Sequence, residues 1–141
     1  MARILLCEIV TPEQIMYSGE IEMLIVPALD GELGVLPLHA PMVAALREGE
    51  VRVKHADETY EWFAVSGGYL QVHEDKAIVL ADEAVASSQI DVAHARESVR
   101  LIEARLQELR ASSGTIGSPE VDQLLRDLAW QTVQIKVAAR R

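Results

Sequence analysis

The sequence predicts an N-terminal antiparallel β-sandwich followed by a C-terminal antiparallel two-helix hairpin. Residues 4–84 form short apolar runs that are separated by turn signals about every 8 to 12 residues, which is typical of a sandwich or barrel. Residues 92–111 and 119–135 instead carry apolar side chains at alternating spacings of four and three, which place them on one helix face. We therefore expect a β-sandwich domain over residues 1–86 and a helical hairpin domain over residues 87–141.

The β part contains several strands that its pattern predicts separately. Val51-Arg52-Val53-Lys54 alternates apolar and cationic side chains, as a half-buried antiparallel strand does. Residues 76–81 are almost continuously apolar, which favours a central strand, while Ser18-Gly19 and Gly67-Gly68 are expected to break the chain. The other strands are expected at residues 4–10, 21–26, 42–46, 59–66 and 69–73.

Residues 30–41 are the most irregular stretch before the C-terminal third and predict a rigid loop. Gly31 and Gly34 permit positive φ, whereas Pro37 and Pro41 fix φ and favour extended conformations in the residues before them. Loops of defined shape on a β scaffold commonly bind partners, so this loop is a candidate docking surface. The alternative is that Asp30-Gly31 is an ordinary tight turn and the prolines only end strands.

In the helical part, Asp91 is the expected N-cap of the first helix, with Ser88 as the alternative. Ser118 and Pro119 are expected to start the second helix. The predicted seams consist of Ala95, Val99, Ile102, Leu106 and Leu109 in the first helix and Val121, Leu125, Leu128, Thr132 and Ile135 in the second. Both seams are narrow, so the hairpin needs the sandwich or a partner for stability.

Charge and composition exclude several classes of protein. The net charge is -9, and it lies in residues 1–84, which hold 15 acidic and 5 basic residues (net -10). This sign argues against nucleic-acid binding, since phosphate recognition requires a basic surface. No apolar run is long enough for a transmembrane helix or a signal peptide, so we expect the chain to stay in the compartment where it is made. The single Cys7 is expected to be a buried thiol.

The sequence predicts no catalytic and no metal site. The histidines, which are His39, His55, His73 and His94, lie 16 to 21 residues apart and lack a second ligand at zinc-type spacing. Phosphate-binding glycine loops and a nucleophile elbow are absent, and the acidic residues lie in expected turns. Trp62 and Trp130 are expected to be packing anchors.

Several short motifs occur in a characteristic order and spacing. They are Thr11-Pro12-Glu13, Ser18-Gly19, Val26-Pro27, residues 30–37, His39-Ala40-Pro41, Leu46 with Gly49, Ser66-Gly67-Gly68, residues 79–84 and Ile90-Asp91. Together they resemble the epsilon subunit of the F-type rotary ATP synthase of bacteria and chloroplasts. The resemblance covers the β part and the entry to the first helix, while the helices match mainly in length and pattern.

The resemblance implies a flattened sandwich of about ten strands and a two-helix hairpin at the foot of the central stalk. In this family the sandwich binds the gamma subunit and rests on the membrane-embedded c-subunit ring. The subunit is non-catalytic, couples proton flow to ATP synthesis, and inhibits ATP hydrolysis when its helices extend toward the alpha and beta subunits. The expected location is peripheral, at the cytoplasmic face of the bacterial plasma membrane or, alternatively, the stromal face of the thylakoid, with membrane contact only through the ring.

The resemblance also implies sites. Asp30, Gly31, Glu32 and His39 are expected to dock on the c-ring, with a structural hydrogen-bonding role as the alternative for His39. Lys136, Arg140 and Arg141 are the expected inhibitory tip, and the alternative is that they only complement the helix dipole or form a frayed tail.

Two positions depart from the family pattern. Some members bind ATP through a motif in which an arginine stands where this chain has His94, after Ile90 and Asp91. A neutral imidazole lacks the permanent forked charge that suits phosphate, so we expect no cofactor and no nucleotide sensing here. Leu38 stands where a glycine is usual. The alternative to a stalk subunit is a free-standing β-sandwich binding module that dimerises through its hairpin.

Overall fold

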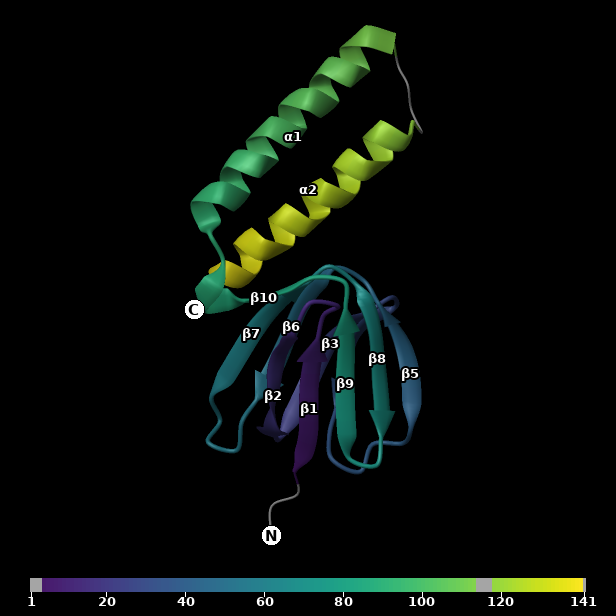
Figure 1. Ribbon diagram of the computed structural model, residues 1–141, viewed down its shortest axis with the longest axis vertical. Coiled ribbons are helices and arrows are strands. Elements are labelled where there is room, and N and C mark those ends of the chain that lie inside the picture. Colours follow the sequence, from purple (N-terminus) through teal and green to yellow (C-terminus); the bar gives the residue numbers. More distant parts are fainter. Residues whose placement is uncertain (1–3, 114–117, 141) are drawn as a thin grey trace.

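The structure is a computed structural model that describes residues 4–113 and 118–140. These residues form ten strands, one short 3₁₀ helix and two α-helices (Figure 1). The strands are β1 (Leu5–Val10), β2 (Ile15–Ile21), β3 (Met23–Ala28), β4 (Gly31–Val35), β5 (Met42–Leu46), β6 (Gly49–Lys54), β7 (Tyr60–Val65), β8 (Gly68–His73), β9 (Lys76–Ala81) and β10 (Ala84–Ala86). The 3₁₀ helix η1 (Ser87–Gln89) leads into α1 (Val92–Ser113), which is followed by α2 (Pro119–Ala138).

The ten strands form one continuous sheet that curls around a single apolar core. Its order is β10-β7-β6-β3-β5-β8-β9-β1-β2, with β4 paired to β3 alone. Neighbouring strands are antiparallel except for β1 and β9, which run parallel. The predicted ten-stranded sandwich followed by a helical hairpin is therefore confirmed, and β9 is central, as its apolar pattern indicated.

Alternation along the strands decides which side chains enter the core. In β1, Leu5, Cys7 and Ile9 are buried, while the residues between them face outward. Cys7 is 1% exposed, which confirms the predicted buried thiol, and burial raises its pKa to about 12. At the start of β8, a Cβ on Gly68 would lie 1.9 Å from the carbonyl oxygen of Leu80, so only glycine fits there.

Two expectations about turns were wrong. Ser18 and Gly19 lie inside β2, where Gly19 pairs with Cys7. Pairing with β1 along the whole of β2 keeps these two residues extended. The expected rigid loop at residues 30–41 contains strand β4. Its two glycines are poor strand formers, but pairing with β3 places Leu33 opposite Val26 and stabilises the strand.

The ends of the helices agree with the predicted caps. The N–H of His94 donates to Asp91 Oδ1 (3.0 Å) at the start of α1, and the N–H of Val121 donates to Ser118 Oγ (3.2 Å) at the start of α2. The predicted seam of α2 was wrong at two positions. Leu125 is 46% exposed, and Thr132 is exposed with its hydroxyl donating to the carbonyl oxygen of Leu128 (2.7 Å).

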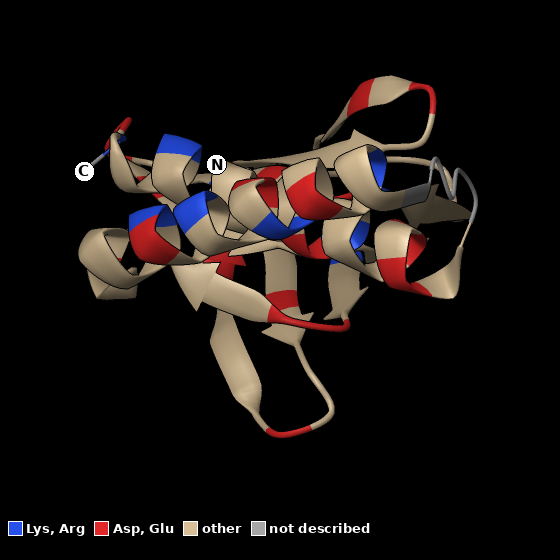
Figure 2. Ribbon diagram, turned by 90° about the horizontal axis from the view of Figure 1, so that it is seen from above, with Lys and Arg blue, Asp and Glu red and all other residues tan. Residues whose placement is uncertain are grey.

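The hairpin projects from one end of the sandwich, and the C-terminal end of α2 lies closest to the strands (Figure 1). We call this end the hairpin end; it includes Gly49, Val65 and Gly68, at the ends of β6, β7 and β8. The opposite end, called the far end, includes the β8–β9 turn at Glu74 and Asp75. Figure 2 shows acidic residues along the loops of the sandwich and most of the basic residues on the helices. Neither described helix is both long and apolar enough to cross a membrane.

Candidate functional site

The residues predicted to dock on the c-ring are divided between the two ends of the sandwich. Asp30, Gly31 and Glu32 lie at the hairpin end, since Ala28 pairs with both Gly31 and Leu46. Asp30 and Glu32 are exposed, and Gly31 has φ 133°, a value that glycine adopts readily. These three residues form the turn and first strand positions after β3, and they constitute one surface.

His39 lies at the far end, where the loop after β4 is tied to the β8–β9 turn. The N–H of Leu38 donates to Asp75 Oδ1 (2.6 Å), and the N–H of His39 donates to the carbonyl oxygen of Leu36 (3.1 Å). Pro37 and Leu38 thus occupy the central positions of a turn in which Leu38 has φ 68°, as in a type II turn. His39 donates from Nδ1 to the carbonyl oxygen of Ala40 (2.8 Å). The structure therefore does not bring His39 together with the other three residues.

Charged residues from three elements meet at the hairpin end, and we call Glu32, Arg52, Glu50 and Arg140 the charge cluster. Glu32 pairs with Arg52, whose Nε lies 3.4 Å from Glu50 Oε1. On its other oxygen, Glu50 accepts a hydrogen bond from Arg140 Nε (2.9 Å). The predicted tip residue Lys136 lines a cavity of about 460 Å³ with these four residues. Arg141, the third predicted tip residue, lies outside the described residues.

Sequence reasoning missed Glu50 and identified Arg52 only as an outward-facing cation. The alternation of residues 51–54 indicates which side chains point away from the core. However, the contact between Glu50 and Arg140 joins residues that are 90 positions apart. Sequence patterns within a single segment do not predict such a contact, so it becomes visible only in the folded structure.

An apolar junction joins the hairpin to the sandwich beside the charge cluster. Ala64, Ile90, Val137 and Ala138 are buried there, with the partly buried Trp62, Val85, Val92, Trp130 and Val133 packed against them. The predicted role of both tryptophans as packing anchors is thus confirmed. The Trp62 ring also stacks on that of Tyr60, with ring centroids 5.8 Å apart.

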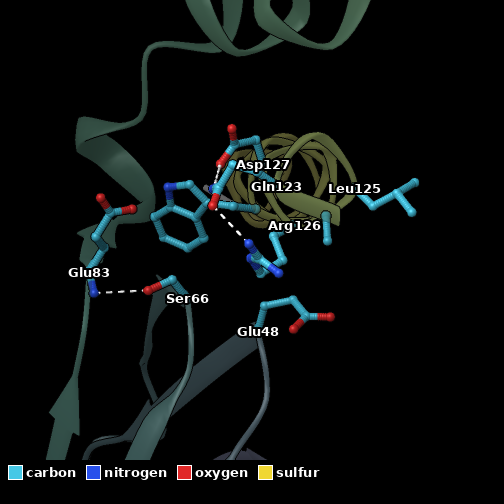
Figure 3. Close-up of a pocket in the computed structure, with 9 residues that line it drawn as sticks. Glu48, Ser66, Glu83, Gln123, Leu125, Arg126 and Asp127 are labelled. Carbon is cyan, nitrogen blue, oxygen red and sulfur yellow. Dashed lines mark hydrogen bonds between the residues drawn. The ribbon is translucent and has the colours of Figure 1, made fainter. Parts of the chain in front are cut away.

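A cavity of about 500 Å³ lies between α2 and the hairpin end of the sandwich (Figure 3). Arg126 of α2 points toward Glu48, which follows β5, and the N–H of Glu83 donates to Ser66 Oγ (2.9 Å). Trp130 closes one side, so the walls combine charges with an aromatic face. The residues of the predicted nucleotide motif, Ile90, Asp91 and His94, are not among those that line it.

A row of apolar side chains crosses the outer face of four neighbouring strands. Ala45 of β5 pairs with Tyr69 of β8, Tyr69 with Leu80 of β9, and Leu80 with Val10 of β1. Tyr69 is 57% exposed and Leu80 is 45% exposed, whereas Ala45 and Val10 are half-buried. We call these four residues the apolar row. Val43, which is 69% exposed, lies on the same face two residues before Ala45.

Known proteins resemble this chain in sequence. The model of the ATP synthase delta/epsilon chain β-sandwich domain matches residues 5–87. The ATP synthase epsilon chain of Desulforamulus reducens is 43% identical over 106 residues, covering 75% of this chain and 80% of that relative. The epsilon chain of Dehalococcoides mccartyi is 36% identical over 134 residues, covering 95% of this chain and 91% of that relative.

The likeness in three dimensions extends over the helices. A chain in a cryo-EM structure of the Euglena gracilis mitochondrial ATP synthase has a TM-score of 0.74 at 18% identity, covering 98% of this chain and 82% of that chain. At this identity the match concerns the fold alone. The fold, a β-sandwich followed by a helical hairpin, together with the matched domain places the chain in the delta/epsilon class. The matched domain and the relatives at 43% and 36% identity then decide the family: the chain belongs to the ATP synthase epsilon chain family.

Proposed function

We propose that the chain is a non-catalytic central-stalk subunit of an F-type ATP synthase that couples proton translocation to ATP synthesis and restrains ATP hydrolysis. Family membership supports the assignment to that enzyme. The apolar row, with Tyr69 and Leu80 exposed, is the observation that carries a role as a binding subunit, because a contiguous apolar strip on an outer sheet face is typical of a protein contact surface.

The partner that we propose for the apolar row is the gamma subunit. Tyr69 is the expected anchor, because a tyrosine combines a large apolar area with a polar tip, and such residues dominate protein interfaces. Gln71, two residues along β8, faces the same way, and it is also exposed. Tyr69→Glu should abolish a one-to-one complex with gamma in size-exclusion chromatography, whereas Gln71→Glu should weaken the complex far less. Equal elution of the wild type and the Tyr69 variant with gamma would contradict this assignment.

We propose that the turn formed by Asp30, Gly31 and Glu32 contacts polar, partly basic loops of the c-subunit ring. Two exposed carboxylates support this, each worth about 0.2–1 kcal/mol at a wet rim. This contact would hold the chain at the cytoplasmic face of the bacterial membrane, or at the stromal face in a chloroplast, without entering the bilayer. The double variant Asp30→Asn/Glu32→Gln should weaken assembly onto ring-containing membranes about 2- to 30-fold while gamma binding is retained.

We propose that inhibition depends on release of the hairpin toward the alpha and beta subunits. The hairpin is attached mainly through the end of α2, and the cations Lys136 and Arg140 lie at that end. Deleting residues 87–141 should leave stalk assembly intact and raise the ATPase activity of the assembled enzyme. Unchanged activity would count against the inhibitory role.

We propose that the chain does not sense nucleotide through Ile90, Asp91 and His94. The carboxylate of Asp91 caps α1, and Ile90 is 5% exposed in the junction, so these groups already have structural roles. Isothermal titration of ATP into the isolated chain should show no binding. A measurable ATP affinity that His94→Arg increases would reverse this proposal.

A second candidate is a free-standing module that dimerises through the hairpin. It is favoured by Leu101 and Leu125, which are 54% and 46% exposed on the two helices. Size-exclusion chromatography with light scattering separates the two candidates. A self-dimer that gamma does not alter supports the module, whereas a monomer that forms a one-to-one complex with gamma supports the stalk subunit.

A further inference from the structure

We propose that Glu32 controls the attachment of the hairpin through Arg52 and Glu50, so that a basic group binding at the β3–β4 turn loosens Arg140. The basic group would belong to the ring, and only its identity rests on the function proposed above. The control itself is a property of the charge cluster. It links the surface proposed for ring docking to the helices proposed for inhibition.

Glu50 is the group on which two cations converge. Its side chain is only 9% exposed, and its two carboxylate oxygens face different arginines. Arg140 Nε donates to one oxygen at 2.9 Å, while Arg52 Nε lies 3.4 Å from the other. The hairpin therefore holds the better hydrogen bond to this shielded carboxylate.

Arg52 also pairs with Glu32, and its approach to Glu50 is through Nε at 3.4 Å. One terminal nitrogen of its guanidinium binds Glu32 Oε2, and its buried Nε makes no hydrogen bond with any described residue. A guanidinium binds a carboxylate best through two parallel N–H groups. If Glu32 loses its charge or pairs with another cation, Arg52 can turn two parallel N–H groups of its guanidinium toward Glu50. The attraction of Glu50 for Arg140 then falls.

The charge of the turn indicates a basic occupant. Glu32 has a side chain that is 63% exposed, and Asp30 beside it is also exposed, so two carboxylates are accessible to a partner. Lys136 and Arg140 line the same cavity as Glu32. A cation bound at Glu32 would repel both, which acts in the same direction as the displacement of Arg52.

Hydrogen exchange of the Val137 and Ala138 amides, measured by NMR on the full chain at low ionic strength, tests the proposal. Glu32→Gln should accelerate exchange about two- to fivefold, the range expected for an exposed ion pair. Glu32→Lys, which places a cation at the turn, should accelerate it more. The matched control is Glu22→Gln, which removes a 3.6 Å pair with Lys54 elsewhere on β6 and should change nothing at α2.

The decisive comparison repeats Glu32→Gln in an Arg52→Gln background. The relay requires Arg52, so the acceleration should disappear there; Glu50→Gln offers a second background with the same expectation. If the acceleration persists in both backgrounds, Glu32 acts only through its electrostatic field and the proposal is overturned. The absence of any effect of Glu32→Gln in the wild-type background would overturn it as well. Failure of ring docking is a separate result, since these experiments use no ring.

Discussion

The sandwich and the hairpin junction differ in how much apolar surface holds each together. Among the residues that the structure describes, the core of the sandwich contains 18 buried residues, whereas the buried part of the junction consists of Ala64, Ile90, Val137 and Ala138. Two of those four are alanines, which bury little area. Because burial of a large apolar side chain is worth about 1.5–3 kcal/mol, the sandwich is stabilised far more strongly than the attachment of the hairpin. We therefore expect the hairpin to detach before the sandwich unfolds.

The largest expected effect is in the sandwich core. Leu24 is fully buried in β3, the strand that pairs with β4, β5 and β6. Leu24→Ala should lower the free energy of unfolding by about 2–5 kcal/mol, because it leaves a cavity where strands converge. Urea unfolding followed by far-ultraviolet circular dichroism measures this. A loss below 1 kcal/mol would mean that the core is less tightly packed than the burial indicates.

Alkaline pH should weaken the same core through Cys7. Its pKa is raised by burial, chiefly, and by Glu8, from 9.0 to about 12, so the unfolded chain loses the thiol proton first. The contribution of the Cys7 thiol to the free energy of unfolding is therefore fully present below pH 9 and is lost as pH rises toward 12. The loss amounts to about 2 kcal/mol at pH 10.5. Urea midpoints at pH 8 and pH 10.5 should differ less in Cys7→Ala than in the wild type; equal differences would assign the effect to other groups.

At the junction the expected effect is smaller and local. Val137 is fully buried against the sandwich, and Val137→Ala removes about two methylene equivalents, or about 1–2 kcal/mol of attachment. Helix signal at 222 nm should melt at a lower temperature, while the unfolding midpoint of the sandwich, followed by NMR signals of β8 and β9, stays the same. If both transitions shift together, the two parts form one cooperative unit and the comparison fails.

The sequence predicted the sandwich because alternation and turn residues are local signals. It also predicted both helix caps, since Asp91 and Ser118 act on amides three residues away. It failed at Gly19 and at β4, where pairing with a neighbouring strand overrides poor strand propensity. Long-range partners are invisible to such patterns.

The candidate site was predictable to a lesser degree. The acidic turn at Asp30 and Glu32 stands out in the sequence, and the structure shows both residues exposed. Grouping them with His39 failed because β4 carries the chain from one end of the sandwich to the other between them. The pairing of Glu50 with Arg140 depends on how the hairpin docks, which no spacing within either segment encodes.

The smallest expected effect separates backbone strain from burial at the far end of the sandwich, opposite the hairpin. Leu38 has φ 68°, a conformation that costs a residue with a Cβ about 1 kcal/mol, and its side chain is 61% exposed. Leu38→Gly should therefore raise the free energy of unfolding by at most about 1 kcal/mol, reduced by the greater freedom of glycine in the unfolded chain.

The matched control is Leu36→Gly in the same turn. Leu36 is 55% exposed, so its apolar burial is similar, but its φ is not positive, and glycine there should destabilise by about 0.5–1 kcal/mol. Thermal unfolding should thus shift in opposite directions for the two variants. Destabilisation by both would mean that the contacts of the Leu38 side chain outweigh its strain. Opposite signs would instead show that the sandwich tolerates a strained turn at its rim.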